Sequence, residues 1–189
     1  MVQYKIFNVV ASSYVTDGIN LHELIYYLPE ARYDPSGFRA IVITQDNPKS
    51  AQLIFEDGRV VSTGARSINS AERSISNVGV MLEEAGVPVY DKLYIEIENI
   101  VARASIEKKL DLHYLAQVMD DVEFNPEEFP GIIKKEIFKK EDDEEYEVST
   151  LIFSSGKIVI TGHKSVEELK ESFENIVHEI ENKMSELKE

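Results

Sequence analysis

Two asparagines lie in nearly the same sequence context, and a threonine followed by glycine also occurs twice. Residues 6–11 read Ile-Phe-Asn-Val-Val-Ala and residues 97–102 read Ile-Glu-Asn-Ile-Val-Ala, while Thr63-Gly64 recurs as Thr161-Gly162. Amides and hydroxyls form hydrogen bonds without carrying charge. Asn8 and Asn99 would be poor core residues unless they were hydrogen-bonded. The pattern therefore indicates either recognition of a polar ligand or the satisfaction of local turns.

The residue sets of common catalytic and metal sites are missing from the sequence. The chain has no cysteine, which excludes disulfides, thiolate metal ligands and a thiol nucleophile and favours an intracellular compartment. His22, His113, His163 and His178 show no zinc-ligand spacing, and we expect them to be surface or helix residues. No nucleophile elbow, phosphate-binding loop or dinucleotide fingerprint occurs. We therefore expect no enzymatic activity, no cofactor and no metal.

The chain is an internal repeat. Matching residues are 91 positions apart at Asn8 and Asn99, and 98 positions apart at Phe55 and Phe153. The second copy has thus gained seven residues between these two places. Repeats of this size indicate two similar modules rather than a single irregular domain.

We expect the first module to be residues 1–90 and the second to be residues 91–189. The added residues are most simply placed at about 139–147, a segment with six acidic residues. A charge run of this kind is typical of a solvated loop or the tip of an extended hairpin.

Each module predicts the same order of elements. β-Branched runs, turn residues and apolar spacing indicate strands and helices. Asn20 and Asp111 are at positions typical of helix N-caps. Strands are expected at 5–11, 39–44, 51–55, 59–63 and 96–102, and short helices at 21–28 and 112–119.

A longer helix closes each module. Apolar residues recur at helical spacing from Ile68 to Leu82 and from Val166 to Ile180, and Ser165 with Glu168 forms a capping-box pattern. The prediction is an α+β fold in which helices cover one face of an antiparallel sheet. The other face stays open, and an open apolar face needs a partner.

Several segments together resemble the core of the TATA-box-binding protein family. The resemblance covers nearly the whole chain, in order and in both copies, and the short N-terminus is similar to the archaeal branch. The segments that match the family are 8–11, 33–38 and 53–64 in the first copy and 99–102, 124–131 and 151–162 in the second.

The resemblance implies a general transcription factor. Two pseudo-twofold repeats would form one saddle-shaped sheet that binds and bends A·T-rich promoter DNA through the minor groove. The partners implied are a transcription factor B homologue and, indirectly, RNA polymerase, with a possible homodimer when DNA is absent. The implied location is the cytoplasm, at the nucleoid, and nothing indicates a membrane: no apolar run is long enough to span one.

The resemblance also assigns residues. Phe38 with Phe55, and Phe129 with Phe153, correspond to the intercalating pairs. Asn8 and Asn99 correspond to the central asparagines. The groove-lining positions are Val10, Leu53, Val61, Thr63, Val101, Leu151, Val159 and Thr161. The phosphate-contacting positions are Arg59, Lys135 and Lys157, with Arg66 and Lys164 as looser matches. The partner contact involves Glu127 and Glu128.

These residue types suit a minor groove. Its floor offers adenine N3 and thymine O2 as acceptors, to which Asn and Thr can donate, while Val and Leu would clash with the amino group of guanine. Phenylalanine wedges unstack a base step at each end, and the wider apolar contact with bent DNA offsets that cost.

The first copy departs from the family pattern. Thr44 is found where the resemblance expects a basic residue, and Glu56-Asp57 places acid near the expected phosphates. Gly37-Phe38-Arg39 also lacks the Phe-Pro-Gly of the second copy. The alternative is a divergent paralogue that keeps the saddle and works as a protein-binding regulator with weak or no DNA binding.

The overall charge, taken alone, argues against DNA binding. The 189 residues carry a net charge of −15, whereas a phosphate-binding protein is expected to be basic. The acid is unevenly distributed, because residues 1–90 hold 7 basic and 10 acidic residues and residues 91–189 hold 13 and 25. We expect the basic residues to gather on the binding face, and binding to be salt-sensitive.

Overall fold

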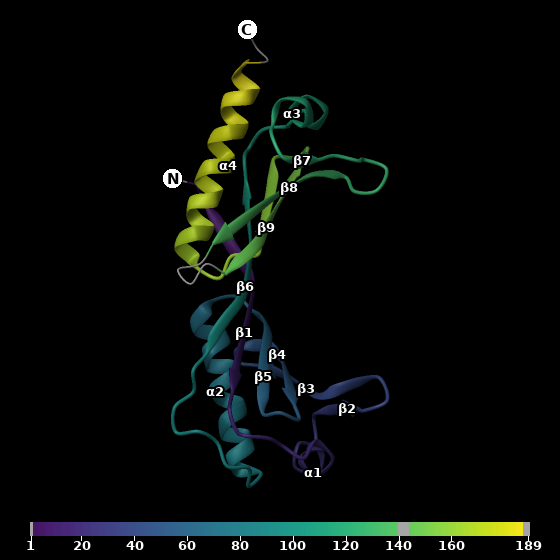
Figure 1. Ribbon diagram of the computed structural model, residues 1–189, viewed down its shortest axis with the longest axis vertical. Helices are drawn as coiled ribbons and strands as arrows, with labels where there is room; N and C mark the ends of the chain where they lie inside the picture. The colour runs from purple at the N-terminus through teal and green to yellow at the C-terminus, as the bar shows by residue number, and fades with distance from the viewer. Residues whose placement is uncertain (1, 140–143, 187–189) are drawn as a thin grey trace. The chain divides into compact units, whose positions relative to one another are not determined.

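The structure is a computed structural model that describes residues 2–139 and 144–186 (Figure 1). The chain divides into two compact units. One is Phe7–Glu98, and the other combines the first six residues with the chain from Asn99 onward. Within the described ranges, no helix is both long and apolar enough to cross a membrane.

The first unit is an antiparallel sheet with one long helix. Its strand order is β2-β3-β4-β5-β1. The elements in chain order are β1 (Tyr4–Tyr14), α1 (Leu21–Leu24), the 3-10 turn η1 (Ile25–Tyr27), β2 (Arg32–Asp34), β3 (Phe38–Asp46), β4 (Lys49–Phe55), β5 (Arg59–Ala65) and α2 (Ile68–Glu84). The predicted helix at 21–28 is therefore a single α-turn extended by a 3-10 turn, and Pro29 follows it.

The second unit repeats this plan with the strand order β6-β10-β9-β8-β7. Its elements are β6 (Glu96–Ser105), α3 (Leu112–Val118), β7 (Val122–Glu123), β8 (Gly131–Lys139), β9 (Glu145–Phe153), β10 (Lys157–Thr161) and α4 (Val166–Glu186). The α+β class is confirmed. β8 and β9 stay paired out to Lys139 and Glu145, so this part of the acidic insertion is an extended hairpin. The expected tip lies partly outside the described residues, which stop at 139 and resume at 144.

The helices cover one face of the strands in each unit. α2 lies against β4 and β5 (Figure 1). Ile75, Val78 and Leu82 of α2 are fully buried, as are Leu169, Phe173 and Ile180 of α4. Burying apolar side chains along one helical stripe is the main stabilising term for such a layer.

Side chains on the strands alternate between this core and the open face. In β4, Gln52 and Ile54 are buried, while Leu53 and Phe55 between and beside them are half-buried. The same alternation in β10 buries Ile158 and Ile160 and leaves Val159 half-exposed. Because successive strand residues point to opposite faces, the open face predicted from the sequence is present in each unit.

The predicted helix caps form. The Asn20 and Asp111 side chains accept hydrogen bonds from the backbone N–H groups of Glu23 and Tyr114. Ser165 Oγ accepts from the Glu168 N–H at 3.3 Å. The other half of the predicted capping box is wrong, because the Glu168 carboxylate accepts instead from the Tyr146 hydroxyl at 3.0 Å.

Candidate nucleic-acid interface

A backbone amide fixes the orientation of Asn8 on the open face of the first unit. Asn8 Oδ1 accepts from the Gly64 N–H at 2.7 Å and from the Thr63 hydroxyl at 3.4 Å. A backbone N–H can only donate, so the amide oxygen must face Gly64. The amide NH2 group of Asn8 therefore points away from Gly64 and offers donors to a ligand.

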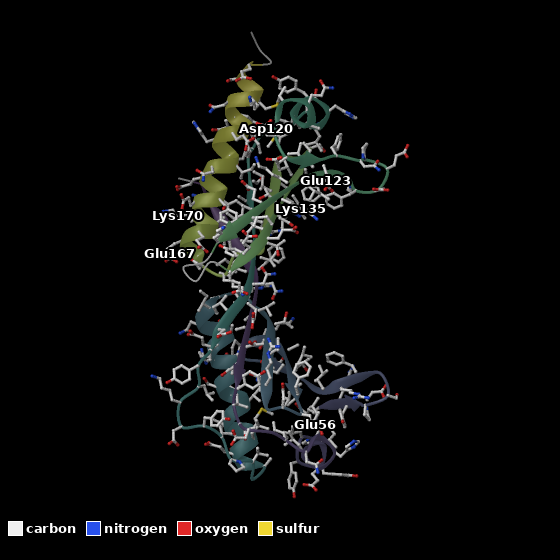
Figure 2. All side chains as sticks on the ribbon, in the orientation of Figure 1. Glu56, Asp120, Glu123, Lys135, Glu167 and Lys170 are labelled. Carbon is white, nitrogen blue, oxygen red and sulfur yellow. The ribbon has the colours of Figure 1, made fainter. Side chains whose placement is uncertain are left out.

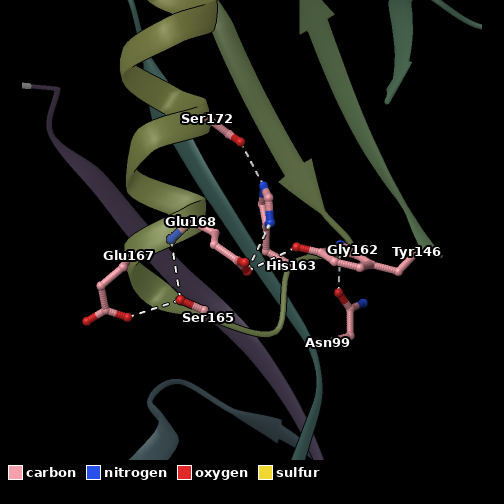
Figure 3. A network of polar contacts seen from close by, with 8 residues as sticks. All are labelled: Asn99, Tyr146, Gly162, His163, Ser165, Glu167, Glu168 and Ser172. Carbon is pink, nitrogen blue, oxygen red and sulfur yellow. Dashed lines mark hydrogen bonds and ion pairs between the residues drawn. The ribbon is translucent and has the colours of Figure 1, made fainter. Parts of the chain in front are cut away.

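Asn99 repeats this arrangement in the second unit (Figure 3). Its Oδ1 accepts from the Gly162 N–H at 2.7 Å, and its Nδ2 donates to Thr161 Oγ1 at 3.1 Å. Gly162 adopts a φ of 120°, and a Cβ there would lie 2.4 Å from the carbonyl oxygen of Glu147. Only glycine fits this position, so the backbone that holds Asn99 is specified by the sequence.

The predicted groove-lining residues flank the asparagines on the same open faces. Leu53 pairs across the strands with Val61, and Leu151 pairs with Val159. All eight positions are half-buried: Val10, Leu53, Val61, Thr63, Val101, Leu151, Val159 and Thr161. These eight positions give each unit a patch of aliphatic side chains with uncharged hydroxyl groups.

Two phenylalanine pairs lie at the β4 and β9 strand ends. The rings of Phe38 and Phe55 are 6.0 Å apart and meet edge to face, and Phe38 is 50% exposed. The rings of Phe129 and Phe153 are 5.6 Å apart. Beneath the second pair is Gly131, where a Cβ would be 3.0 Å from the Phe129 ring and 2.8 Å from the Ile152 carbonyl oxygen. The predicted partners are therefore brought together in both units.

The predicted basic residues differ in their surroundings. Arg59 forms an ion pair with Glu98, with Nη2 3.2 Å from Oε1. Lys135, labelled on β8 in Figure 2, has its Nζ 3.7 Å from Oε1 of Glu147, and both side chains are half-exposed. Lys157 lies 5.9 Å from the centre of the Phe153 ring. Arg66 is exposed and Lys164 half-buried, each shortly after a Thr-Gly pair.

Two other lysines of β8 form ion pairs. Lys134 Nζ is 3.0 Å from Glu179 of α4, and Lys139 Nζ is 3.4 Å from Glu145 across the hairpin. Lys134 and Lys139 are therefore already engaged by acidic side chains.

Sequence reasoning missed Lys5 and Arg103, which share a shallow groove with Lys157 in the second unit. Arg103 is exposed and pairs across the strands with Val159, on the open face. The alternation of Val101, Arg103 and Ser105 could have placed it there. Glu98 was also missed, because its partner Arg59 is 39 positions away and no local pattern connects them.

One of the two acidic departures of the first copy has a local structural role. Asp57 Oδ1 accepts from the Arg59 N–H at 3.0 Å, which closes the turn between β4 and β5. Glu56 is exposed in the same turn (Figure 2). The turn chemistry therefore accounts for Asp57 and not for the charge of Glu56.

The two predicted partner-binding acids lie in a turn next to Phe129. Asn125 Oδ1 accepts from the Glu127 N–H at 3.3 Å, and the Asn125 carbonyl accepts from the N–H groups of Glu128 and Phe129. Glu127 and Glu128 are exposed. One asparagine thus holds a turn that presents two carboxylates to solvent.

The expectation that all four histidines are surface or helix residues is wrong for His163. It is fully buried beyond the end of β10, with Nε2 2.7 Å from Ser172 Oγ of α4 (Figure 3). Burial lowers the pKa of His163, and Glu168, 3.8 Å from Nδ1, opposes this in part. Burial, with the hydrogen bond to Glu168, raises the pKa of Tyr146 to about 12.

This buried cluster supports the Asn99 position. The His163 carbonyl accepts from the Ile100 N–H at 2.8 Å, next to the bond between Gly162 and Asn99. In the parts of the chain that the structure covers, no cluster of acidic and histidine side chains could hold a metal ion.

Comparisons with known proteins agree with these features. A sequence profile for the family described as "Transcription factor TFIID (or TATA-binding protein, TBP)" matches residues 3–85 and again residues 94–183. The TATA-box-binding protein of Archaeoglobus fulgidus is 35% identical over 178 residues, 93% of each chain. That of Methanocaldococcus jannaschii is 38% identical over 178 residues, covering 94% of this chain and 93% of the relative.

A solved structure, "Methanococcus jannaschii TBP", aligns with a TM-score of 0.82 at 37% identity and covers 95% of this chain and 99% of that one. The match confirms the predicted fold class, and the two profile matches confirm the internal repeat. The family consists of transcription factors rather than enzymes. The chain belongs to the TATA-box-binding protein family, and each half of it is one copy of the family's repeat.

Proposed function

We propose that the chain binds the minor groove of A·T-rich promoter DNA through its two open faces. The carrying observation is the repeated hydrogen bond from a glycine N–H to an asparagine oxygen, 2.7 Å long in both units. In each copy it turns the amide NH2 group away from the glycine; one N–H of Asn99 donates to Thr161 Oγ1, and the second is the donor proposed for DNA. The A·T minor groove presents only acceptors, so outward donors among aliphatic side chains match it.

The phenylalanine pairs supply the means of bending. Both pairs are at least partly exposed at strand ends, where a ring can enter between two base steps. Unstacking a step costs a few kcal/mol, and the larger apolar contact with widened DNA offsets it. We propose Phe38, Phe55, Phe129 and Phe153 as the wedges.

The basic residues would contact phosphates. If Arg59, Arg66, Lys135, Lys157 and Lys164 all contribute fully, log K should fall with log salt at a slope of about −4.5, from roughly −0.9 per phosphate. The net charge of −15 then serves to keep non-specific DNA binding weak.

The bound complex would recruit a transcription factor B homologue and, through it, RNA polymerase. Glu127 and Glu128 are the proposed contact, because their turn is exposed and ordered by Asn125.

Such a protein would work at the nucleoid in the cytoplasm. Without DNA, two copies could cover each other's apolar faces, which sedimentation would detect as a concentration-dependent dimer.

A band shift with an A·T-rich duplex, with and without the transcription factor B homologue, tests this function. We expect a shifted complex that the homologue retards further, and E127K/E128K should lose only the second shift. A divergent regulator is the second candidate, favoured by the ion pair that engages Arg59. It would be indicated by a pull-down of the homologue without any shift of the duplex.

A further inference from the structure

One groove of the first unit holds an arginine that already has an anionic partner. The groove has a volume of about 700 Å³, and its lining includes Ser12, Tyr14, Arg59, Lys92, Glu96 and Glu98. Arg59 Nη2 lies 3.2 Å from Glu98 Oε1 and 3.4 Å from Ser12 Oγ. The Ser12 hydroxyl donates to the same Glu98 oxygen at 2.5 Å. One carboxylate oxygen thus receives both a guanidinium and a hydroxyl donor.

This donor set is one that a DNA phosphate oxygen would also use, because phosphates accept from arginine and serine side chains. The pair is open to solvent, with 41% of the Arg59 side chain and 28% of the Glu98 side chain exposed. We infer that Glu98 takes the place of a DNA phosphate at Arg59 in the free protein and so weakens DNA binding. The inference rests on the proposed function, since Arg59 is a proposed phosphate contact.

The equivalent groove of the second unit is basic, whereas Glu96 and Glu98 balance Arg59 and Lys92 in the first groove. The repeat offsets place Arg103 where Ser12 is, Lys157 where Arg59 is, and Lys5 where Glu96 is. These three basic residues line the second groove with Gln3, Tyr4, Ala104 and Ser105, and none of the described residues that line it is acidic. The two grooves therefore differ in one respect that matters for phosphates: the first groove supplies its own anion at Arg59.

The Arg59–Glu98 ion pair should affect DNA binding rather than folding. An ion pair this exposed contributes little to stability, so replacing Glu98 with Gln should leave the fold intact. A phosphate that approaches Arg59, however, must displace the carboxylate or remain close to it, and like charges at an interface oppose association. Glu98→Gln keeps an acceptor for Ser12 while removing the negative charge.

The experiment compares wild type, E98Q, E96Q, R59Q and R59Q/E98Q on one A·T-rich duplex by fluorescence anisotropy across a salt series. Glu96 is the matched control, because it lines the same groove and its change removes the same charge. We expect E98Q to bind about tenfold more tightly and E96Q less than about twofold more tightly. The wild-type slope should be near −3.6 and the E98Q slope near −4.5, because Arg59 then neutralises a phosphate fully.

The R59Q background separates masking of Arg59 from simple repulsion. There, the gain from E98Q should fall to about threefold or less, since no arginine remains to be released. Equal gains in both backgrounds, or equal gains from E98Q and E96Q, would overturn the inference while wild-type binding upheld the proposed function. Binding by E98Q alone would support the inference and contradict the proposed function for the wild-type chain. If neither protein bound at low salt, with urea unfolding showing both folded, the inference and the function would both fail.

Discussion

The first and second copies of the repeat position the same uncharged side chains in the same way but surround them with different charges. Asn8 and Asn99 are each held by a glycine N–H at 2.7 Å, and both phenylalanine pairs are in ring contact. Arg59 has an acidic partner at 3.2 Å, whereas Lys157 shares its groove with Lys5 and Arg103.

The difference shows which features the fold itself requires. An asparagine bonded to a backbone amide depends on glycine at a positive φ, so few substitutions preserve it. Exposed ion pairs contribute little to stability, and charges on the surface can therefore change without loss of the fold. The shared features are those that would read DNA, and the variable ones are those that would set affinity.

The largest expected effect concerns the phenylalanine pairs. F129A/F153A should reduce DNA affinity at least about 30-fold, as loss of a buried aromatic anchor does. F38A/F55A should cost about tenfold, because Phe38 is half exposed and Ala40, not glycine, lies opposite Phe55. Fluorescence energy transfer between the duplex ends measures the bend, and an unchanged bend angle in F129A/F153A would contradict the wedge assignment.

The asparagines should behave alike in the two halves. N8D and N99D replace amide donors with a carboxylate, and each should weaken binding by about tenfold because the groove offers only acceptors. N175D, on the exposed side of α4, adds the same charge away from the face and controls for it. Anisotropy titrations that give all three variants the same affinity would show that charge alone, and not the amide, is at work.

DNA binding should respond differently when the basic side chain of each groove is removed. K157Q removes a basic side chain whose groove supplies no acidic partner. We expect the affinity for DNA to fall about fivefold and the slope of log K against log salt to become less negative by about 0.9. R59Q/E98Q removes the ion pair without changing net charge, so its affinity should stay within about twofold of wild type. A salt series on the K157Q and R59Q/E98Q variants checks this. An equal change in the slope of log K against log salt in both variants would contradict the proposed difference between the two grooves.

The smallest effect is a pH dependence confined to the second half. His163 is buried and its first-copy equivalent is Ala65, which is also buried. Because burial lowers the folded-state pKa of His163, the unfolded chain takes up the proton first as pH falls below 6.5. Stability from neutral His163 is complete above that pH and declines below it, by at most about 1.4 kcal/mol per pH unit.

Urea unfolding at pH 7.5 and 5.5 measures this loss. H163Q should lose less stability over that interval than wild type, whereas H178Q, which alters an exposed histidine of α4, should behave as wild type. The same loss in H163Q and wild type would assign the pH dependence to other groups.

Local pattern predicted much of the fold and part of the site. Apolar periodicity located α2 and α4, and Asn20 and Asp111 were recognised as caps from their residue types. Comparing the two copies of the repeat singled out Asn8, Thr63 and the phenylalanines, because each recurs at the equivalent position of the second copy. Strand alternation also indicated the open face, because the period of two is set by backbone geometry.

Long-range contacts between side chains were beyond local pattern. Glu168 fits a capping box, yet its carboxylate bonds to Tyr146, 22 positions away, beside a buried His163. Glu98 and Arg59 are likewise brought together only by strand pairing across the unit. Pairs of this kind depend on register and twist, which residue spacing along the chain does not specify.

The central claim is that the open faces bind A·T-rich DNA through the minor groove. The most direct measurement is a band shift of the wild-type chain at low salt on an A·T-rich duplex and on the same duplex with G·C pairs at its centre. We expect a shift of the A·T-rich duplex and much weaker binding of the other, because the guanine amino group would meet Leu53, Val61, Leu151 and Val159. No shift of either duplex, or equal shifts of both, would contradict it.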